Sequence, residues 1–141
     1  MSKSGVIVII EDDVDDRKFL SEIISELGVA NELKWLETAE SALEFLSTTF
    51  QSIFIIISDV KLPGQSGLEF KKAVDDDPTL RRKSIPFVFY STDANQDDVN
   101  DAFLNMNTQG FFKKGPDYKK AKDAIKIIFD YWKLCRHPNT Q

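Results

Sequence analysis

The sequence predicts a single α/β domain in which a five-stranded parallel sheet carries five helices on its two faces. Short apolar runs rich in β-branched residues alternate along the chain with segments whose apolar residues recur at helical spacing. The strongest runs are almost continuously apolar, as is typical of strands buried on both faces of a parallel sheet. Such alternation implies right-handed crossovers between parallel strands, each made by a helix.

Five strands are expected. The strongest three are Val6–Ile10, residues 53–57 and residues 86–90, and the weaker two are residues 32–36 and Gly110–Lys113. Periodicity alone leaves open the order of these strands in the sheet.

Five helices are expected between and after the strands, because apolar side chains recur there three and four residues apart. Gly28 is placed to end the first of them. The five apolar stripes are Leu20, Ile24 and Leu27; Ala39, Ala42, Leu43 and Leu46; Phe70, Ala73 and Val74; Val99, Ala102, Phe103 and Met106; and Ile125, Ile128, Phe129 and Trp132.

Length and composition fit one domain over residues 1–141, since 141 residues with 42% hydrophobic content can bury a core. Residues 133–141 are too few to form an output domain. The net charge of -5 gives no general attraction to nucleic acid or to an anionic membrane. Cys135 has no partner for an intramolecular disulfide, and the N-terminal apolar run is too short for a signal peptide, so a cytoplasmic protein is expected.

Polar residues follow the expected strands at the points where they end. In an open parallel sheet the carboxyl ends of the strands meet at one edge, where ligands bind. Each residue alone has a simpler interpretation as a helix cap, turn residue or surface lysine, and Asp13 and Asp15 are expected to serve the first helix in that way. The residues in question are Glu11, Asp12, Asp59, Ser91, Thr92 and Lys114.

The carboxylates in that set predict a cation site. Three carboxylates at one edge repel one another unless positive charge neutralises them, and Mg²⁺ prefers such oxygen ligands. Zinc is disfavoured, because His137 is the single histidine and no cysteine cluster accompanies it.

Several motifs resemble the receiver domain of two-component response regulators. They are Val-Ile-Ile-Glu-Asp-Asp at 8–13, Ser-Asp-Val-Lys-Leu-Pro-Gly-Gln-Ser-Gly-Leu at 58–68, Ser91, and Gly-Phe-Phe-Lys-Lys at 110–114. Each motif alone is weak, but the ordered set covers nearly the whole chain. The resemblance implies a flavodoxin-like receiver fold, like that of the chemotaxis receiver, with strand order 2-1-3-4-5.

The resemblance also implies roles for individual residues. Asp59 resembles the phosphoacceptor, and Glu11 and Asp12 resemble the acidic pair that holds Mg²⁺. Asp12 and Asp59 would be direct ligands, together with the backbone carbonyl of Lys61. Ser91 resembles the hydroxyl residue that turns toward the phosphoryl group, Lys114 the lysine that pairs with it, and Phe111 the aromatic switch residue, while Thr92 stands where the family favours a small residue.

The implied function is a bacterial phosphorylation switch and not an enzyme acting on a separate substrate. The expected partner is a sensor histidine kinase or hybrid kinase, whose phosphohistidine donates the phosphoryl group. The signal is expected to leave through the fourth helix, fifth strand and fifth helix, over residues 97–132, as a homodimer or kinase contact. Residues 129–135 resemble the end of short receivers paired with bacterial phytochrome kinases.

Two rival functions remain open. An aspartate-nucleophile phosphohydrolase would need a cap domain and a second aspartate at position 61, where this chain has Lys61. A phosphorylation-independent docking scaffold is kept open by Thr92 and by Gly115, which follows Lys114 where the family has a cis-proline. The Lys114–Gly115 bond is expected to be trans, because a non-proline cis bond costs about 2.5 to 4 kcal/mol. Lys114 itself is expected to lie at a wet edge, where its loss has little effect on stability.

Overall fold

A computed structural model describes residues 2–92, 96–105 and 110–134. Its five strands form one parallel sheet in the order β2-β1-β3-β4-β5, as the resemblance implied. The strands are β1 (Val6–Ile10), β2 (Leu33–Leu36), β3 (Ile53–Ser58), β4 (Phe87–Ser91) and β5 (Gly110–Lys113).

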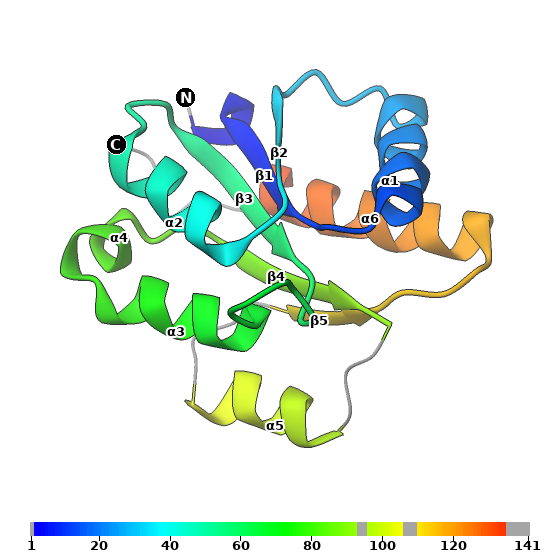
Figure 1. Cartoon of the computed structure of the whole chain (residues 1–141). Helices are drawn as coiled ribbons and strands as arrows, with labels where there is room; N and C mark the ends of the chain where they lie inside the picture. The colour runs from blue at the N-terminus through cyan, green and yellow to red at the C-terminus, as the bar shows by residue number, and fades with distance from the viewer. Residues whose placement is uncertain (1, 93–95, 106–109, 135–141) are drawn as a thin grey trace.

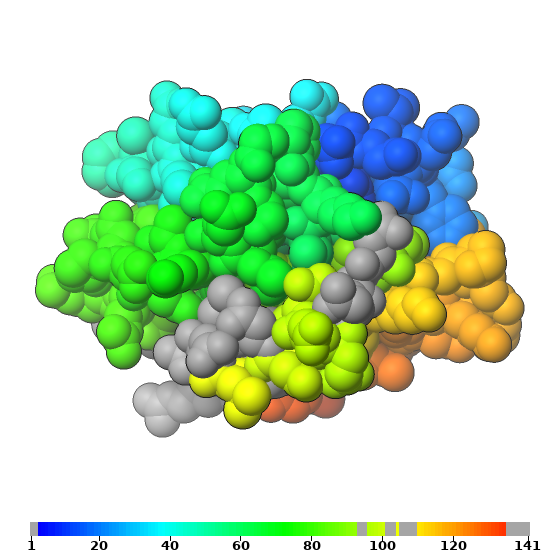
Figure 2. Space-filling model, turned by 60° about the horizontal axis from the view of Figure 1, so that its bottom comes forward, coloured from blue at the N-terminus to red at the C-terminus, as the bar shows by residue number. Residues whose placement is uncertain are grey.

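Helices cover both faces of this sheet (Figure 1). The helices α1 and α6 pack on one face, and α2, α3 and α4 pack on the other. Figure 2 shows α5 on the surface between α3 and α6. The helices are α1 (Val14–Glu26), α2 (Ala39–Thr48), α3 (Gly67–Asp76), α4 (Pro78–Lys83), α5 (Gln96–Asn105) and α6 (Tyr118–Leu134).

The core consists of two apolar clusters, one on each face of the sheet. Successive residues of a strand point to opposite faces, so Ile55 belongs to one cluster and Ile56 to the other. Every residue of β1, β3 and β4 is buried. The continuous apolar runs therefore mark the three central strands, as predicted.

The expected number of five helices is wrong, because the described residues contain six α-helices and a 3₁₀ turn at Ser2–Ser4. The additional helix is α4, whose six residues are too few to show an apolar stripe. Its start is nevertheless encoded, since the Asp77 carboxylate accepts hydrogen bonds from the backbone N–H groups of Thr79 and Leu80, and Pro78 is the first helical residue. The expected fourth and fifth helices are therefore α5 and α6.

The first helix ends where the sequence places its end. Gly28 has a φ of 68° directly after the C-cap of α1, consistent with its expected role in ending that helix. Met106, Cys135 and His137 lie outside the described residues. In the part of the chain that the structure describes, no helix has the length and apolar character that crossing a bilayer requires.

Candidate functional site

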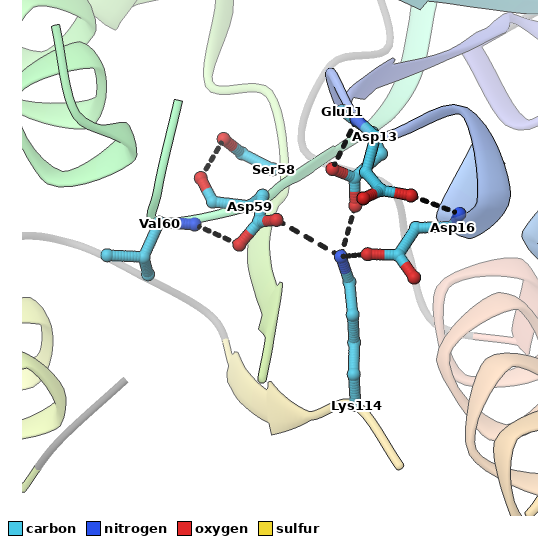
Figure 3. A network of polar contacts seen from close by, with 7 residues as sticks. All are labelled: Glu11, Asp13, Asp16, Ser58, Asp59, Val60 and Lys114. Carbon is cyan, nitrogen blue, oxygen red and sulfur yellow. Dashed lines mark hydrogen bonds and ion pairs between the residues drawn. The ribbon is translucent and has the colours of Figure 1, made fainter. Parts of the chain in front are cut away.

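The ends of β1, β3 and β5 bring three charged side chains together (Figure 3). Glu11 follows β1, Asp59 follows β3 and Lys114 follows β5. Backbone hydrogen bonds fix these ends, because Asp59 N–H donates to the carbonyl of Ile10 at 3.1 Å and Lys114 N–H donates to that of Ser91 at 3.0 Å. The predicted convergence at the carboxyl edge of the sheet is therefore present.

Lys114 lies at the centre of this group. Its Nζ donates to Asp59 Oδ2 at 3.1 Å, to Asp16 Oδ2 at 3.2 Å, and to Glu11 Oε1. Glu11 is only 3% exposed and Lys114 only 8%. The expectation that Lys114 lies at a wet edge is wrong, since Glu11, Asp59 and the ring of Tyr90, 5.8 Å from Nζ, surround its ammonium group.

Burial and neighbouring charges have opposite effects on the pKa values of Glu11 and Lys114. Burial raises the pKa of Glu11 to about 7, although the hydrogen bond and charge of Lys114 pull it down. Burial alone would lower the pKa of Lys114, but its hydrogen bond to Glu11 and the charges of Asp59 and Glu11 outweigh that effect and raise it. The two groups therefore stabilise each other's charged forms in a site where either charge alone would be unfavourable.

The donor set fits a hard divalent cation. Oxygen atoms of Glu11, Asp16 and Asp59 all lie within 4.8 Å of one another. These are the ligands that Mg²⁺ prefers. When ionised, the three carboxylates carry more negative charge than the single ammonium of Lys114 neutralises. Because that ammonium lies among the same oxygen atoms, a bound cation and Lys114 would have to share them.

The composition of the acidic group differs in part from the expected one. Asp12 is exposed and does not belong to the cluster, whereas Asp16 does. Lys61 is an exposed residue in the loop after β3, and the part of its backbone carbonyl in metal binding stays a prediction. Asp13 is the N-cap of α1 and accepts a hydrogen bond from the backbone of Asp16 at 2.9 Å, as its simpler interpretation required. That cap places Asp16 in the first turn, beside Lys114.

Hydrogen bonds fix both the side chain and the backbone of Asp59. The Val60 N–H donates to Asp59 Oδ1 at 2.7 Å, which leaves Oδ2 toward Lys114. The Ser58 hydroxyl donates to the Asp59 carbonyl at 2.8 Å. One carboxylate oxygen is thus held by the loop, and the other faces the charged group.

Gly67, the first residue of α3, packs against the backbone of Asp59. Its N–H donates to the carbonyl of Val60 at 2.7 Å, and a Cβ at this position would lie 2.0 Å from the Asp59 carbonyl oxygen. A capping box between Ser66 and Glu69 fixes this end of the helix. Only glycine permits so close an approach, so the start of α3 lies directly against the backbone of Asp59.

The predicted switch residues lie on β4 and β5. Ser91, at the end of β4, is 1% exposed, and Thr92 directly after it is exposed. Phe111 on β5 is half-buried, and its ring centroid lies 5.3 Å from that of Phe89. Phe89 and Ser91 point to the same face of β4, so Phe111 lies on the face of the sheet that Ser91 also faces. The Lys114–Gly115 bond is trans, as expected.

Comparison with known proteins identifies relatives of this architecture. The response regulator receiver domain family matches residues 7–126. Response regulator Rcp1 of Synechocystis sp. is 26% identical over 132 residues, which cover 90% of this chain and 88% of Rcp1.

Solved structures agree on the fold. The Mn²⁺-bound form of Rcp1 superposes with a TM-score of 0.82 at 24% identity, covering 95% of this chain and 99% of that one. The phosphorylated cyanobacterial phytochrome response regulator RcpA gives a TM-score of 0.81 at 24% identity, covering 92% and 94%. With the strand order observed and most of its length matched, this chain belongs to the response regulator receiver domain family of two-component signalling.

Proposed function

We propose that this receiver accepts a phosphoryl group on Asp59 from the phosphohistidine of a sensor or hybrid kinase, in a Mg²⁺-dependent reaction, and signals by a change of its surface. The observation that carries the proposal is the position of Lys114. Its buried ammonium group contacts Asp59 Oδ2 and Glu11 together. A cation held at the acceptor oxygen can neutralise the charge that develops during phosphoryl transfer.

The residues of the site have separable tasks in this reaction. Asp59 Oδ2 is the nucleophile, because Val60 N–H holds the other oxygen. Lys114 brings positive charge to an anionic donor that a bare carboxylate would repel. Mg²⁺ would be held by Asp59 and its neighbours Glu11 and Asp16, with Asp12 and the Lys61 carbonyl as the further ligands that the resemblance implies, and would supply neutralising charge.

The relatives support this assignment at the level of the fold. Rcp1 has been solved with Mn²⁺ bound, and RcpA has been solved in a phosphorylated form. The product in this chain would be an aspartyl phosphate on the protein itself, so the domain is a phosphoacceptor and not an enzyme with a separate substrate. The grouping of Lys114 with Asp59 favours this function over a docking scaffold that ignores phosphate.

The signal would leave through α5, β5 and α6. A phosphoryl group on Asp59 offers acceptor oxygens to Ser91 and Lys114, and movement of Ser91 changes the space available to Phe111. Next to β5, α6 exposes Ile127, Tyr131 and Leu134, of which Tyr131 is 60% exposed. A second copy of the chain or the kinase would bind this apolar surface.

Hydrogen exchange tests the switch. Beryllofluoride with Mg²⁺, which mimics the phosphoryl group, is expected to change amide protection in the loop after β3 and also in α5, β5 and α6. Asp59→Asn, which removes the acceptor, is the control and should show neither change. Altered protection around Asp59 with α5, β5 and α6 unaffected would contradict the proposed output surface, and no change anywhere would contradict the proposed function.

A further inference from the structure

Lys114 contacts the carboxylate oxygens that the proposed reaction needs (Figure 3). The Asp13 N–H donates to Glu11 Oε2 at 3.3 Å, and Lys114 Nζ donates to the other oxygen, Oε1. In the same way, Val60 N–H donates to Asp59 Oδ1, while Lys114 Nζ donates to Oδ2, the proposed nucleophile. Because like charges repel, the ammonium group has to move away when these two carboxylates bind a divalent cation.

Asp16 is the third partner of the ammonium group and differs from the other two. Its Oδ2 accepts a hydrogen bond from Lys114 Nζ at 3.2 Å, and its side chain is 43% exposed, whereas that of Glu11 is buried. Water can solvate the carboxylate of Asp16 when the ammonium group is elsewhere, so the contact contributes little to stability. Its importance lies in where it holds the ammonium group.

Lys114 has room to move on the side of Asp16. A cavity of about 290 Å³ lies there, and its lining includes Asp16, Phe19, Tyr90 and Lys114. The ring centroid of Tyr90 lies 5.8 Å from Lys114 Nζ, and aromatic faces attract ammonium groups. The backbone of Lys114 is fixed, because its N–H donates to the carbonyl of Ser91 at 3.0 Å. Movement is therefore confined to the side chain, whose flexible stem permits it.

We propose that Asp16 is a positioning residue of the phosphorylation site, an inference that rests on the proposed function of Asp59. The ammonium group of Lys114 withdraws to Asp16 when the other two carboxylates bind a divalent cation, and there it keeps one anionic partner. It also stays near the acceptor, since oxygen atoms of Asp16 and Asp59 lie within 4.8 Å of each other. Without Asp16 the ammonium group would have no carboxylate to withdraw to, so cation binding would be weaker.

A double-mutant cycle on Mg²⁺ affinity tests the inference. Calorimetry would measure Mg²⁺ binding to the wild type, Asp16→Asn, Lys114→Met and the double variant. Asp16→Asn is expected to weaken binding about threefold to tenfold more when Lys114 is present than in the Lys114→Met background, the size expected for one partly exposed hydrogen bond. The loss of a charge or of a direct ligand at Asp16 acts in both backgrounds and cancels in this comparison.

Asp15→Asn is the matched control for the cycle. It makes the same chemical change at the exposed residue that precedes Asp16 in the first turn of α1. Any effect of this variant comes from the general loss of negative charge, so it should weaken Mg²⁺ binding equally with and without Lys114.

A second measurement follows Lys114 itself in a chain that keeps this residue, because Lys114→Met is expected to be less stable. With Mg²⁺ the ε-methylene protons of Lys114 should give stronger nuclear Overhauser effects to the rings of Phe19 and Tyr90 than they give in EDTA. Asp16→Asn should reduce this gain, because the ammonium group then lacks its partner beside the cavity.

The outcomes separate the two proposals. Equal losses of Mg²⁺ affinity in the two backgrounds, or no approach of Lys114 to the two rings, would overturn the role of Asp16. The proposed function would still stand if acetyl phosphate labelled Asp59 in a Mg²⁺-dependent reaction. Failure of the wild-type chain to be labelled at Asp59 would overturn the proposed function itself.

Discussion

Replacing Lys114 with methionine is expected to destabilise the resting domain by about 3 kcal/mol at pH 8, measured by urea unfolding. Methionine keeps most of the volume of the side chain but removes the charge. Glu11, only 3% exposed, would then lack the cation that balances it. The sequence alone predicts a solvent-exposed Lys114 whose loss has little effect on stability. The burial of the Lys114–Glu11 pair reverses that expectation.

The loss should depend on pH. Lys114 lowers the pKa of Glu11, so its removal raises that pKa further above the ordinary value of 4.5. Well below pH 4.5, Glu11 is protonated in both the folded and the unfolded chain, so its burial carries no penalty for a buried charge. As pH rises, the unfolded chain ionises first and the variant loses stability until the folded pKa is passed. The deficit relative to wild type should therefore be smaller at pH 5 than at pH 8.

Two further variants make this prediction specific. Lys113→Met removes an exposed lysine one residue earlier and should change stability little. Adding Glu11→Gln to Lys114→Met should restore part of the loss, because no buried carboxylate is then left without a partner. Equal stability of Lys114→Met and Lys113→Met at pH 8 would show that the buried pair contributes nothing to the fold.

Gly67→Ala is expected to displace the phosphoacceptor. The new methyl group would lie 2.0 Å from the Asp59 carbonyl oxygen, and backbone atoms cannot move aside as a flexible side chain can. We expect a loss of at least about 2 kcal/mol in stability. Among molecules that fold, labelling by acetyl phosphate should slow by about 10-fold to 100-fold, because the acceptor is misplaced.

Gly115→Ala is the control for this prediction. It adds the same methyl group next to Lys114, at a position where no atom beyond the two adjacent residues lies within 4 Å of the added carbon. Its stability should be close to that of the wild type. If Gly67→Ala is as stable as Gly115→Ala and is labelled as fast as the wild type, the start of α3 does not position Asp59.

The central strands and the position of the site could be predicted from the sequence, because each depends on a single local pattern. The apolar runs of β1, β3 and β4 predicted the central strands, because burial on both faces leaves no polar position. The polar residues after those strands predicted the site, because parallel strands end at one edge. Strand order came only from the resemblance, since periodicity is the same in every arrangement of the strands.

Features that depend on neighbours in space were missed. The burial of Lys114 depends on Glu11 and Tyr90, which are distant in sequence. Asp16 was overlooked among the acids of the first turn, although the Asp13 cap was recognised and directs that turn toward the strand ends. The role of Gly67 depends on a contact with Asp59 that no local pattern contains.

The most direct test of the central claim is mass spectrometric mapping of the protein after incubation with acetyl phosphate. With Mg²⁺ present, we expect one phosphoryl group per chain, located on Asp59. The label should be absent in EDTA and in Asp59→Asn, because the first removes the neutralising cation and the second the nucleophile. Undiminished labelling in EDTA, or label retained by Asp59→Asn at another residue, would contradict the account of this domain as an Asp59 phosphorylation switch.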